Sequence, residues 1–205
     1  MNDEKSIRAF LAIEPPAEIR QEIGDIQNSL KRRCPFDVRW VKPDGIHLTL
    51  KFFGSVSEED IMAISRVVEE NTAVASPLHL KVNKVGLFPS RRRPRVLWIG
   101  LGGDTPPLLV MQENLEQGFA GHGFAKEERP FRPHLTIGRV KTPHTSGDPE
   151  QFMANADDWA AGSFIAPGLG LFKSDLTPQG AVHTRLAWFP FGLSRDRFQI
   201  SAVKM

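Results

Sequence analysis

The hydrophobic positions of the chain repeat with two different periods. A period of two predicts strands, and a period near 3.6 predicts helices with one apolar face. Strands are expected at residues 7–14, 38–41, 46–53, 78–88, 96–101, 134–140, 164–172 and 183–191. Helices are expected at residues 17–31, 57–75, 106–121 and 150–161. Because strands and helices alternate, the pattern predicts an α+β fold.

The order of the expected elements repeats once along the chain. A β-α-β-β-α-β set is followed by a similar set, and no linker between them is long enough to separate two domains. We therefore expect a single domain over residues 1–205, built from two related lobes with antiparallel sheets and with helices outside. A pseudo-two-fold arrangement of these lobes would bring equivalent faces of the two sheets to a shared central cleft.

One short motif occurs twice, at equivalent places in the two sets. The first copy is His47-Leu48-Thr49-Leu50, and the second, His134-Leu135-Thr136-Ile137, begins 87 residues later (134 minus 47). In a strand, the histidine and the threonine of each copy share one face, and the two aliphatic residues share the other. We expect the aliphatic residues in the core, and an imidazole with a hydroxyl on each wall of the cleft.

Two opposed imidazoles suit a reaction that moves protons. The unperturbed pKa of histidine is about 6.5, so near neutral pH one ring can accept a proton while the other donates one. In-line displacement at phosphorus needs both transfers, and threonine hydroxyls can bind the phosphoryl oxygens. Two other interpretations stay open at this point. The histidines could be purely structural, or they could bind a metal, although the sequence offers no third ligand and no His-Glu-x-x-His or Cys-x-x-Cys motif.

Composition and charge narrow the class of protein. The 205 residues are 40% hydrophobic and 24% charged, which is ordinary for a water-soluble domain. The apolar run at residues 7–13 is too short for a signal peptide or a membrane span, so we expect an untargeted, cytoplasmic protein without membrane contact. Cys34 is the only cysteine, which excludes an intramolecular disulfide and a thiolate zinc site within one chain. The net charge is only +2, but Arg91-Arg92-Arg93-Pro94-Arg95 forms a dense basic loop that either binds an anion or is simply solvated.

Segments around the two motifs carry a wider resemblance. Arg8-Ala9-Phe10-Leu11-Ala12-Ile13 stands near the start, Trp40-Val41-Lys42-Pro43 before the first motif, Phe52-Phe53-Gly54 after it, and Arg129-Pro130-Phe131-Arg132-Pro133 before the second. Together these segments resemble the 2H phosphoesterase superfamily. Within it the chain is most similar to the bacterial and archaeal RNA 2′,3′-cyclic phosphodiesterases, also called 2′-5′ RNA ligases or LigT-like proteins. The resemblance covers the chain from about residue 6 to residue 190.

The resemblance implies a bilobal α+β fold and a reaction without a metal or another cofactor. Members of the family open the 2′,3′-cyclic phosphate of an RNA end, or of a small nucleotide, to a 2′-phosphomonoester. By this analogy His134 is the base that activates water, and His47 is the acid that protonates the departing 3′ oxygen. Thr49 and Thr136 would hold the phosphate. We expect a monomer without an obligate protein partner.

Three further positions carry weaker signals. Arg139 resembles a basic position of the family that could contact phosphate, and a surface ion pair is the alternative. Phe10 matches an aromatic position that could pack under a base or ribose, although a core phenylalanine is the commoner role. Family members often carry a tyrosine after the glycine of a Ser-x-Leu-x-x-x-Gly turn, whereas here Ser174 to Gly180 leads to His183 and the chain has no tyrosine. His183 either substitutes for that tyrosine or faces solvent.

The same histidine pair is compatible with other functions. The reverse reaction would join RNA through a 2′-5′ bond, and hydrolysis of 2′-5′-linked oligonucleotides would use the same groups. A third possibility is a protein that binds RNA ends through its basic loops without turnover. A substrate panel separates the first two from cyclic phosphate hydrolysis, and replacement of both histidines by alanine would leave the third function largely intact.

Overall fold

The computed structural model describes residues 6–145, 149–154, 159–178 and 180–192. Within these residues a single sheet contains all nine strands. The strands are β1 (Ile7–Ile13), β2 (Phe36–Trp40), β3 (Leu48–Val56), β4 (Leu78–Phe88), β5 (Val96–Gly103), β6 (His134–Thr145), β7 (Ala160–Ala166), β8 (Gly168–Thr177) and β9 (Gly180–Pro190). The helices are α1 (Ala17–Lys31), the 3-10 turn η1 (Pro43–Gly45), α2 (Glu58–Ala73), α3 (Thr105–Gly121) and α4 (Pro149–Met153).

The sheet is antiparallel at each of its strand pairs. Its order is β7-β4-β5-β6-β3-β1-β8-β9, and β2 pairs with β6 beside this path. Strand β6 meets β3 only near its start and pairs with β2 farther along. The two sheets expected for two lobes are therefore joined into one at β3 and β6.

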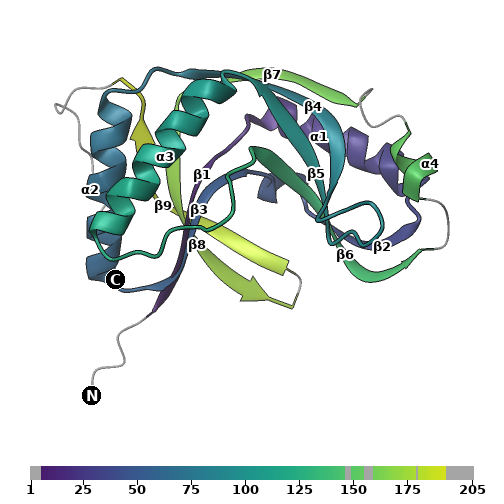
Figure 1. Ribbon diagram of the computed structural model, residues 1–205, viewed down its shortest axis with the longest axis horizontal. Helices are drawn as coiled ribbons and strands as arrows, with labels where there is room; N and C mark the ends of the chain where they lie inside the picture. The colour runs from purple at the N-terminus through teal and green to yellow at the C-terminus, as the bar shows by residue number, and fades with distance from the viewer. Residues whose placement is uncertain (1–5, 146–148, 155–158, 179, 193–205) are drawn as a thin grey trace.

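The two halves of the sheet pack against different helices. The half formed by β1, β3, β8 and β9 contacts α2, on which α3 packs, and the half formed by β2 and β4 to β7 contacts α1. Figure 1 shows α2 and α3 at the left of the molecule and α1 and α4 at the right. Both halves take strands from distant parts of the chain, so the expectation of two consecutive lobes is wrong. Antiparallel pairing brings together strands that are far apart in sequence, which local periodicity does not register.

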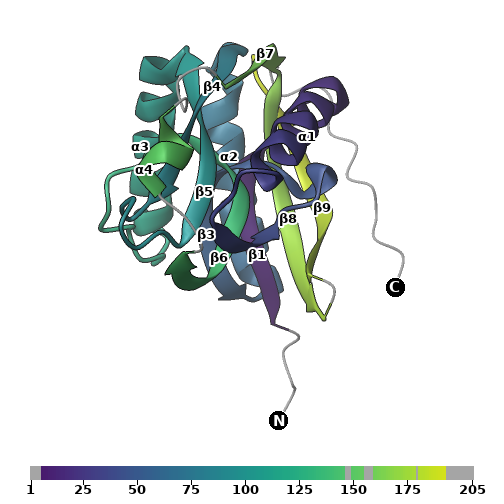
Figure 2. The same ribbon diagram turned by 90° about the vertical axis from the view of Figure 1, so that its right-hand side faces the viewer.

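The sheet curls strongly, and a single residue connects its first strand to its last strand but one. Pro167 alone separates β7, the first strand of the sheet, from β8, the last strand but one. Figure 2 shows β7 at the top of the molecule, next to the upper ends of β8 and β9. The prediction of one strand over residues 164–172 is therefore wrong. Proline has no N–H to donate to a ladder, and the chain changes from one end of the sheet to the other at this position.

Two other predicted elements have different bounds in the structure. The helix expected at residues 150–161 ends at Met153, and the chain from Ala160 onward pairs with β4 as strand β7. The strand expected at residues 134–140 continues to Thr145, because β2 pairs along it. In both places long-range pairing overrides the local pattern.

The long helices follow their sequence signals. The hydroxyl oxygen of Ser57 accepts a hydrogen bond from the Asp60 N–H at 3.1 Å, and the Asp60 carboxylate accepts one from the Ser57 N–H at 2.8 Å, which caps α2. The apolar face expected for α1 is buried in the core. None of the described helices has the length and apolar character needed to cross a bilayer.

Candidate active site

The two repeated motifs meet at the centre of the sheet, on β3 and β6. The register pair between these strands is Leu48 with Leu135. An antiparallel pair has a local two-fold axis, and His47 and His134 each lie one residue before the paired leucine. The two histidines are therefore equivalent about that axis, and so are the two threonines, one residue after the leucines.

The side chains of the motifs alternate as the sequence predicts. The aliphatic residues of both copies are buried in the core, whereas the histidines and threonines are partly exposed. The hydroxyls of Thr49 and Thr136 make no hydrogen bond to the described part of the chain. Both hydroxyls are therefore available to a ligand on the histidine face of the sheet.

The two histidine rings are oriented in the same way. Nδ1 of His47 lies 2.9 Å from the carbonyl oxygen of Gly45, and Nδ1 of His134 lies 2.7 Å from that of Arg132. In each copy the carbonyl belongs to the residue two places before the histidine. Because a carbonyl oxygen only accepts hydrogen bonds, Nδ1 carries the proton and Nε2 of the neutral ring presents a lone pair. Each ring is set for proton transfer at Nε2.

A β-bulge in β6 turns Arg139 toward the histidine face. The register against β5 shifts between Thr136 and Gly138, so two steps along β6 match one step along β5. Residues five places apart in a regular strand point to opposite faces, and the bulge brings Arg139 to the same face as His134. There Arg139 is exposed and in register with Arg39 of β2.

Strand β3 has the same bulge at the same distance from its histidine. The register against β1 shifts between Thr49 and Lys51, and Phe52, five residues after His47, lies on the histidine face with 61% of its surface exposed. Nothing in the local sequence pattern marks Phe52 as a site residue. In β6 the sequence signal is Gly138 itself. The structure shows why a glycine stands there, because a Cβ would lie 2.6 Å from a methyl carbon of Val38. A glycine inside a strand pattern often marks a bulge, and β3 has none at the equivalent place.

A glutamine buried behind each bulge donates to its backbone. Nε2 of Gln27, on α1, donates to the carbonyl oxygen of Ile137 at 2.8 Å and to that of Val41 at 2.7 Å. Nε2 of Gln112, on α3, approaches the carbonyl oxygen of Leu50 to 3.5 Å. Ile137 and Leu50 are the fourth residues of the two motifs. The helices thus supply donors to carbonyl groups where the bulges interrupt the ladder.

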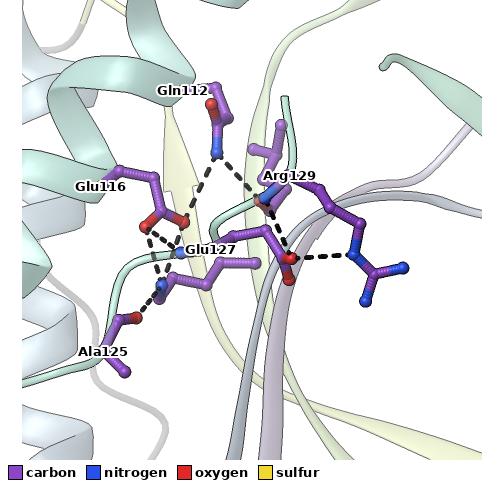
Figure 3. Close-up of polar contacts among 7 residues, drawn as sticks. Gln112, Glu116, Ala125, Glu127 and Arg129 are labelled. Carbon is purple, nitrogen blue, oxygen red and sulfur yellow. Dashed lines mark hydrogen bonds and ion pairs between the residues drawn. The ribbon is translucent and has the colours of Figure 1, made fainter. Parts of the chain in front are cut away.

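A buried ion pair ties β3 to α3 on the core side. Nζ of Lys51 lies 2.8 Å from Oε2 of Glu116 and donates to the carbonyl oxygen of Ala125 at 2.8 Å. The amide of Gln112 also reaches the Glu116 carboxylate, at 3.5 Å. Figure 3 shows Gln112 and Glu116 projecting from the same side of α3. The strand that carries His47 is therefore held to its helix directly after the motif.

Each histidine belongs to a cluster of three aromatic rings. His47 stacks on Phe10 with 4.7 Å between ring centroids, and His183 stands edge-on to both, at 5.2 Å from His47 and 4.9 Å from Phe10. His134 meets Phe88 at 5.1 Å and Trp98 at 6.4 Å. These contacts restrict the orientation of both imidazoles.

The ring of Phe10 is buried and packs against the ring of His47. Its side chain is 1% exposed and contacts His47, Phe172 and His183. This burial favours the alternative of a core phenylalanine, since it leaves the ring little surface for a substrate. The contact between Phe10 and a substrate stays a prediction. A small pocket next to these rings is lined by Phe10, Glu14, Asp44, Ile46, His47, Phe172 and His183.

The electrostatics of the site keep both imidazoles neutral at pH 7. Burial, the neighbouring His183 and the Arg139 guanidinium lower the pKa of His47 to about 4, against the opposing effect of its backbone hydrogen bond. Burial and Arg139 also lower the pKa of His134, whose backbone hydrogen bond acts in the other direction. One guanidinium therefore acts on both rings. Arg139 lies within electrostatic reach of the space that the histidines share.

The described residues contain no group of three or more His, Cys, Asp or Glu side chains that could hold a metal ion. The expectation that the reaction needs no metal stays a prediction.

Most of the chain matches one known family. A family model described as LigT-like phosphoesterase covers residues 13–98 and 103–183. The chain belongs to the LigT-like phosphoesterase family. A relative from Methanothermobacter thermautotrophicus, named RNA 2′,3′-cyclic phosphodiesterase, is 33% identical over 184 residues, which are 89% of this chain and 98% of the relative. One of the same name from Methanocaldococcus jannaschii is 32% identical, over 86% of this chain and 96% of the relative.

Solved structures of LigT-like proteins share the fold. The protein TT0787 of Thermus thermophilus superposes with a TM-score of 0.75 at 25% identity, over 91% of this chain and 98% of that chain. Escherichia coli LigT in complex with 3′-AMP gives a TM-score of 0.71 at 27% identity, over 92% of this chain and the whole of that chain. The predicted α+β fold and the family resemblance are confirmed.

Proposed function

We propose that this LigT-like phosphoesterase hydrolyses 2′,3′-cyclic phosphodiester ends of RNA to 2′-phosphomonoesters. The observation that carries the proposal is the two-fold pair of histidines, each with Nδ1 bonded to a backbone carbonyl and Nε2 available for proton transfer. Two relatives named RNA 2′,3′-cyclic phosphodiesterase support the substrate, and a nucleotide is bound in the complex of E. coli LigT with 3′-AMP.

Each histidine has one proton to move in this reaction. His134 takes a proton from water as the water oxygen bonds to phosphorus, and His47 gives a proton to the 3′ oxygen as its bond to phosphorus breaks. The hydroxyls of Thr49 and Thr136 donate hydrogen bonds to the non-bridging oxygens, and Arg139 balances their charge. The phosphate stays on the 2′ oxygen. After turnover, solvent removes the proton from His134 and returns one to His47.

Because the pKa of His47 is low in the free protein, substrate binding is expected to promote its protonation. A pKa of about 4 leaves His47 neutral in the free protein at pH 7. A phosphodiester anion placed within about 4–6 Å favours the imidazolium, so its charge opposes the effects of burial and of Arg139. His47 is therefore expected to gain its proton together with the substrate.

A basic surface beside His134 supports RNA as the substrate. Arg139 and Arg39 lie opposite each other on β6 and β2. The loop between β4 and β5 adds Arg92, Arg93 and Arg95, all exposed, and the Arg95 carbonyl accepts a hydrogen bond from β6. Several guanidinium groups along one surface favour a polyanion over a single phosphate.

The exposed ring of Phe52 supports a base contact on the other wall. It lies on the histidine face of β3, 5.6 Å from Phe10 between ring centroids. An exposed aromatic ring next to a phosphate site can stack on a nucleobase.

The activity is tested with 2′,3′-cyclic AMP and with a short RNA that ends in a 2′,3′-cyclic phosphate, both in EDTA. Hydrolysis of both to the 2′-monoester is expected. A control variant, His79→Ala, changes an exposed histidine on β4 and should keep full activity. A 3′-monoester product, or activity that EDTA abolishes and zinc restores, would contradict the proposal. Adding an RNA with a 5′ hydroxyl to the same assay shows whether 2′-5′ joining competes.

A further inference from the structure

The two histidine clusters differ in one chemical property. The rings that contact His134 are Phe88 and Trp98, neither of which titrates. The rings that contact His47 are Phe10 and His183. Within the described residues, only the cluster of His47 therefore holds a second group that can bind a proton. Because of His183, the two histidines that are equivalent about the two-fold axis have chemically different surroundings.

We propose that His183 is a positioning residue for His47, which fixes the plane of that imidazole and competes with it for a single proton. The proposal rests on the function proposed above in one respect, because it takes His47 as the ring that carries a proton during turnover.

The geometry of the cluster fixes the ring of His47 on three sides. Phe10 covers one face, the carbonyl of Gly45 holds Nδ1, and His183 stands at 89° to the imidazole plane. The ring of His183 is also at 77° to that of Phe10, so it stands nearly perpendicular to both stacked rings. Rotation of the His47 ring would collide with one of these three groups.

The same contacts make the two imidazoles compete for a proton. Two positive charges at the centroid separation of 5.2 Å repel each other strongly, so the pair takes up its protons in two separate steps. Nδ1 of His183 is buried and has no hydrogen-bond partner in the described chain, so no acceptor there stabilises the cation. Burial lowers the pKa of both rings, and the charge of His183 lowers the pKa of His47 further. His183 therefore takes the first proton as the pH falls.

Other charged groups face the cluster without pairing with either imidazole. Glu14 follows β1 and Asp44 lies in η1, and both line the pocket. Arg185 of β9 lies 3.4 Å from Glu14 and offsets its charge. From β6, Arg139 opposes protonation of His47, and from β8 the neighbour is the uncharged Phe172. Neither carboxylate forms an ion pair with a histidine among the described residues.

The competition acts at acid pH. Turnover needs a proton on His47, and a positive charge on His183 opposes that proton. Above its own pKa His183 is neutral, so it has no effect on the alkaline limb of the pH profile. Below that pKa, His183 takes the proton first, and the form with a proton on His47 alone becomes rare. Removal of His183 is therefore expected to raise kcat/KM at acid pH relative to the unchanged protein and to leave the alkaline limb where it is.

Two variants separate the proton competition from simple packing. His183→Phe keeps a ring against His47 but cannot titrate, and His183→Gln keeps polarity but loses both the ring and the charge. In both variants NMR titration should show the pKa of His47 above its value of about 4, with the pKa of His134 unchanged. His79→Gln, on an exposed histidine of β4, serves as the control and should change neither.

The proposal is overturned if the titration of His47 is the same in both variants as in the unchanged protein. It is also overturned if His47 changes only in His183→Gln, since that result describes a packing role. The NMR titration requires no turnover. A failure of the competition can therefore be told apart from a failure of the proposed phosphodiesterase activity, which the cyclic phosphate assay reports separately.

Discussion

Arg139 is a charged side chain that acts on both histidines at once. Its guanidinium opposes the protonation of each ring in the free protein, and the same charge attracts the phosphate that the reaction requires. These effects combine usefully, because a bound phosphodiester neutralises the guanidinium and adds its own negative charge near the rings. The histidines are thus neutral before binding, and binding favours a proton on one of them.

Replacement of Arg139 by glutamine tests this arrangement. Because the cation lowers the pKa of both rings, its loss should raise the pKa of His47 and of His134 in the free protein, as read by NMR titration. The loss of a charge-assisted contact of about 1.5–3 kcal/mol should lower kcat/KM by about tenfold to a hundredfold. Arg39→Gln removes the cation directly opposite on β2 and is the matched control for the two histidine titrations. Unchanged histidine titrations, or equal shifts in both variants, would show that Arg139 does not act on the rings.

At the scale of the elements, the motif strands could be predicted from sequence, whereas their bulges could not. The period of two correctly puts His47 and Thr49 on one face, and the same holds for the second copy. The period fails beyond the motif, where the bulges reverse the faces of Arg139 and Phe52. It also fails at Pro167, where one apolar run is divided between the two ends of the sheet. Both failures have the same cause, which is that strand partners far away in sequence decide the local geometry.

The buried glutamines were missed for a related reason. Gln27 falls on the apolar face of α1, and only the partner strand shows that its amide meets the carbonyl of Ile137 and that of Val41. A polar residue on an apolar stripe is the signal that could have identified it, since buried amides need hydrogen-bond partners.

Gln27→Leu is expected to destabilise the protein and to reduce activity together. The change removes the side-chain donor of the Val41 carbonyl and leaves the Ile137 carbonyl with only the Val41 N–H, which costs about 1–3 kcal/mol in the free energy of unfolding. Urea unfolding measures this loss, and kcat/KM at a temperature where the variant is folded shows whether the bulge has moved. Gln21→Leu, an exposed position on the same helix, should change neither quantity. A variant as stable as the unchanged protein would mean that these hydrogen bonds contribute nothing.

At the scale of the whole molecule, the site lies where the two halves of the sheet join. Each half contributes one motif strand, and the register pair of Leu48 with Leu135 links them. Each half also contains strands from early and late parts of the chain. The halves therefore depend on each other, and the site is complete only when both are in place.

The basic surface belongs to the same scale, because it combines β2, β6 and the β4–β5 loop. Replacing Arg92, Arg93 and Arg95 together by glutamine should raise KM for an RNA with a cyclic phosphate end, make its salt dependence shallower, and leave hydrolysis of 2′,3′-cyclic AMP unchanged. The triple change at residues 31–33 removes the same number of cations from the end of α1 and is the control. Equal effects of both triple variants on the RNA would refute a specific contact with the loop.

The proposed mechanism requires both histidines in one reaction at one site. The most direct measurement is kcat/KM for hydrolysis of a 2′,3′-cyclic phosphate by His47→Ala, by His134→Ala and by the double variant. Each single variant is expected to lose about 10²–10⁴-fold, as for the loss of a general acid or base. The double variant should then lose little more than the worse single variant, because the two groups act in the same step. If either single variant, correctly folded, retains activity close to that of the unchanged protein, the two-histidine account is wrong.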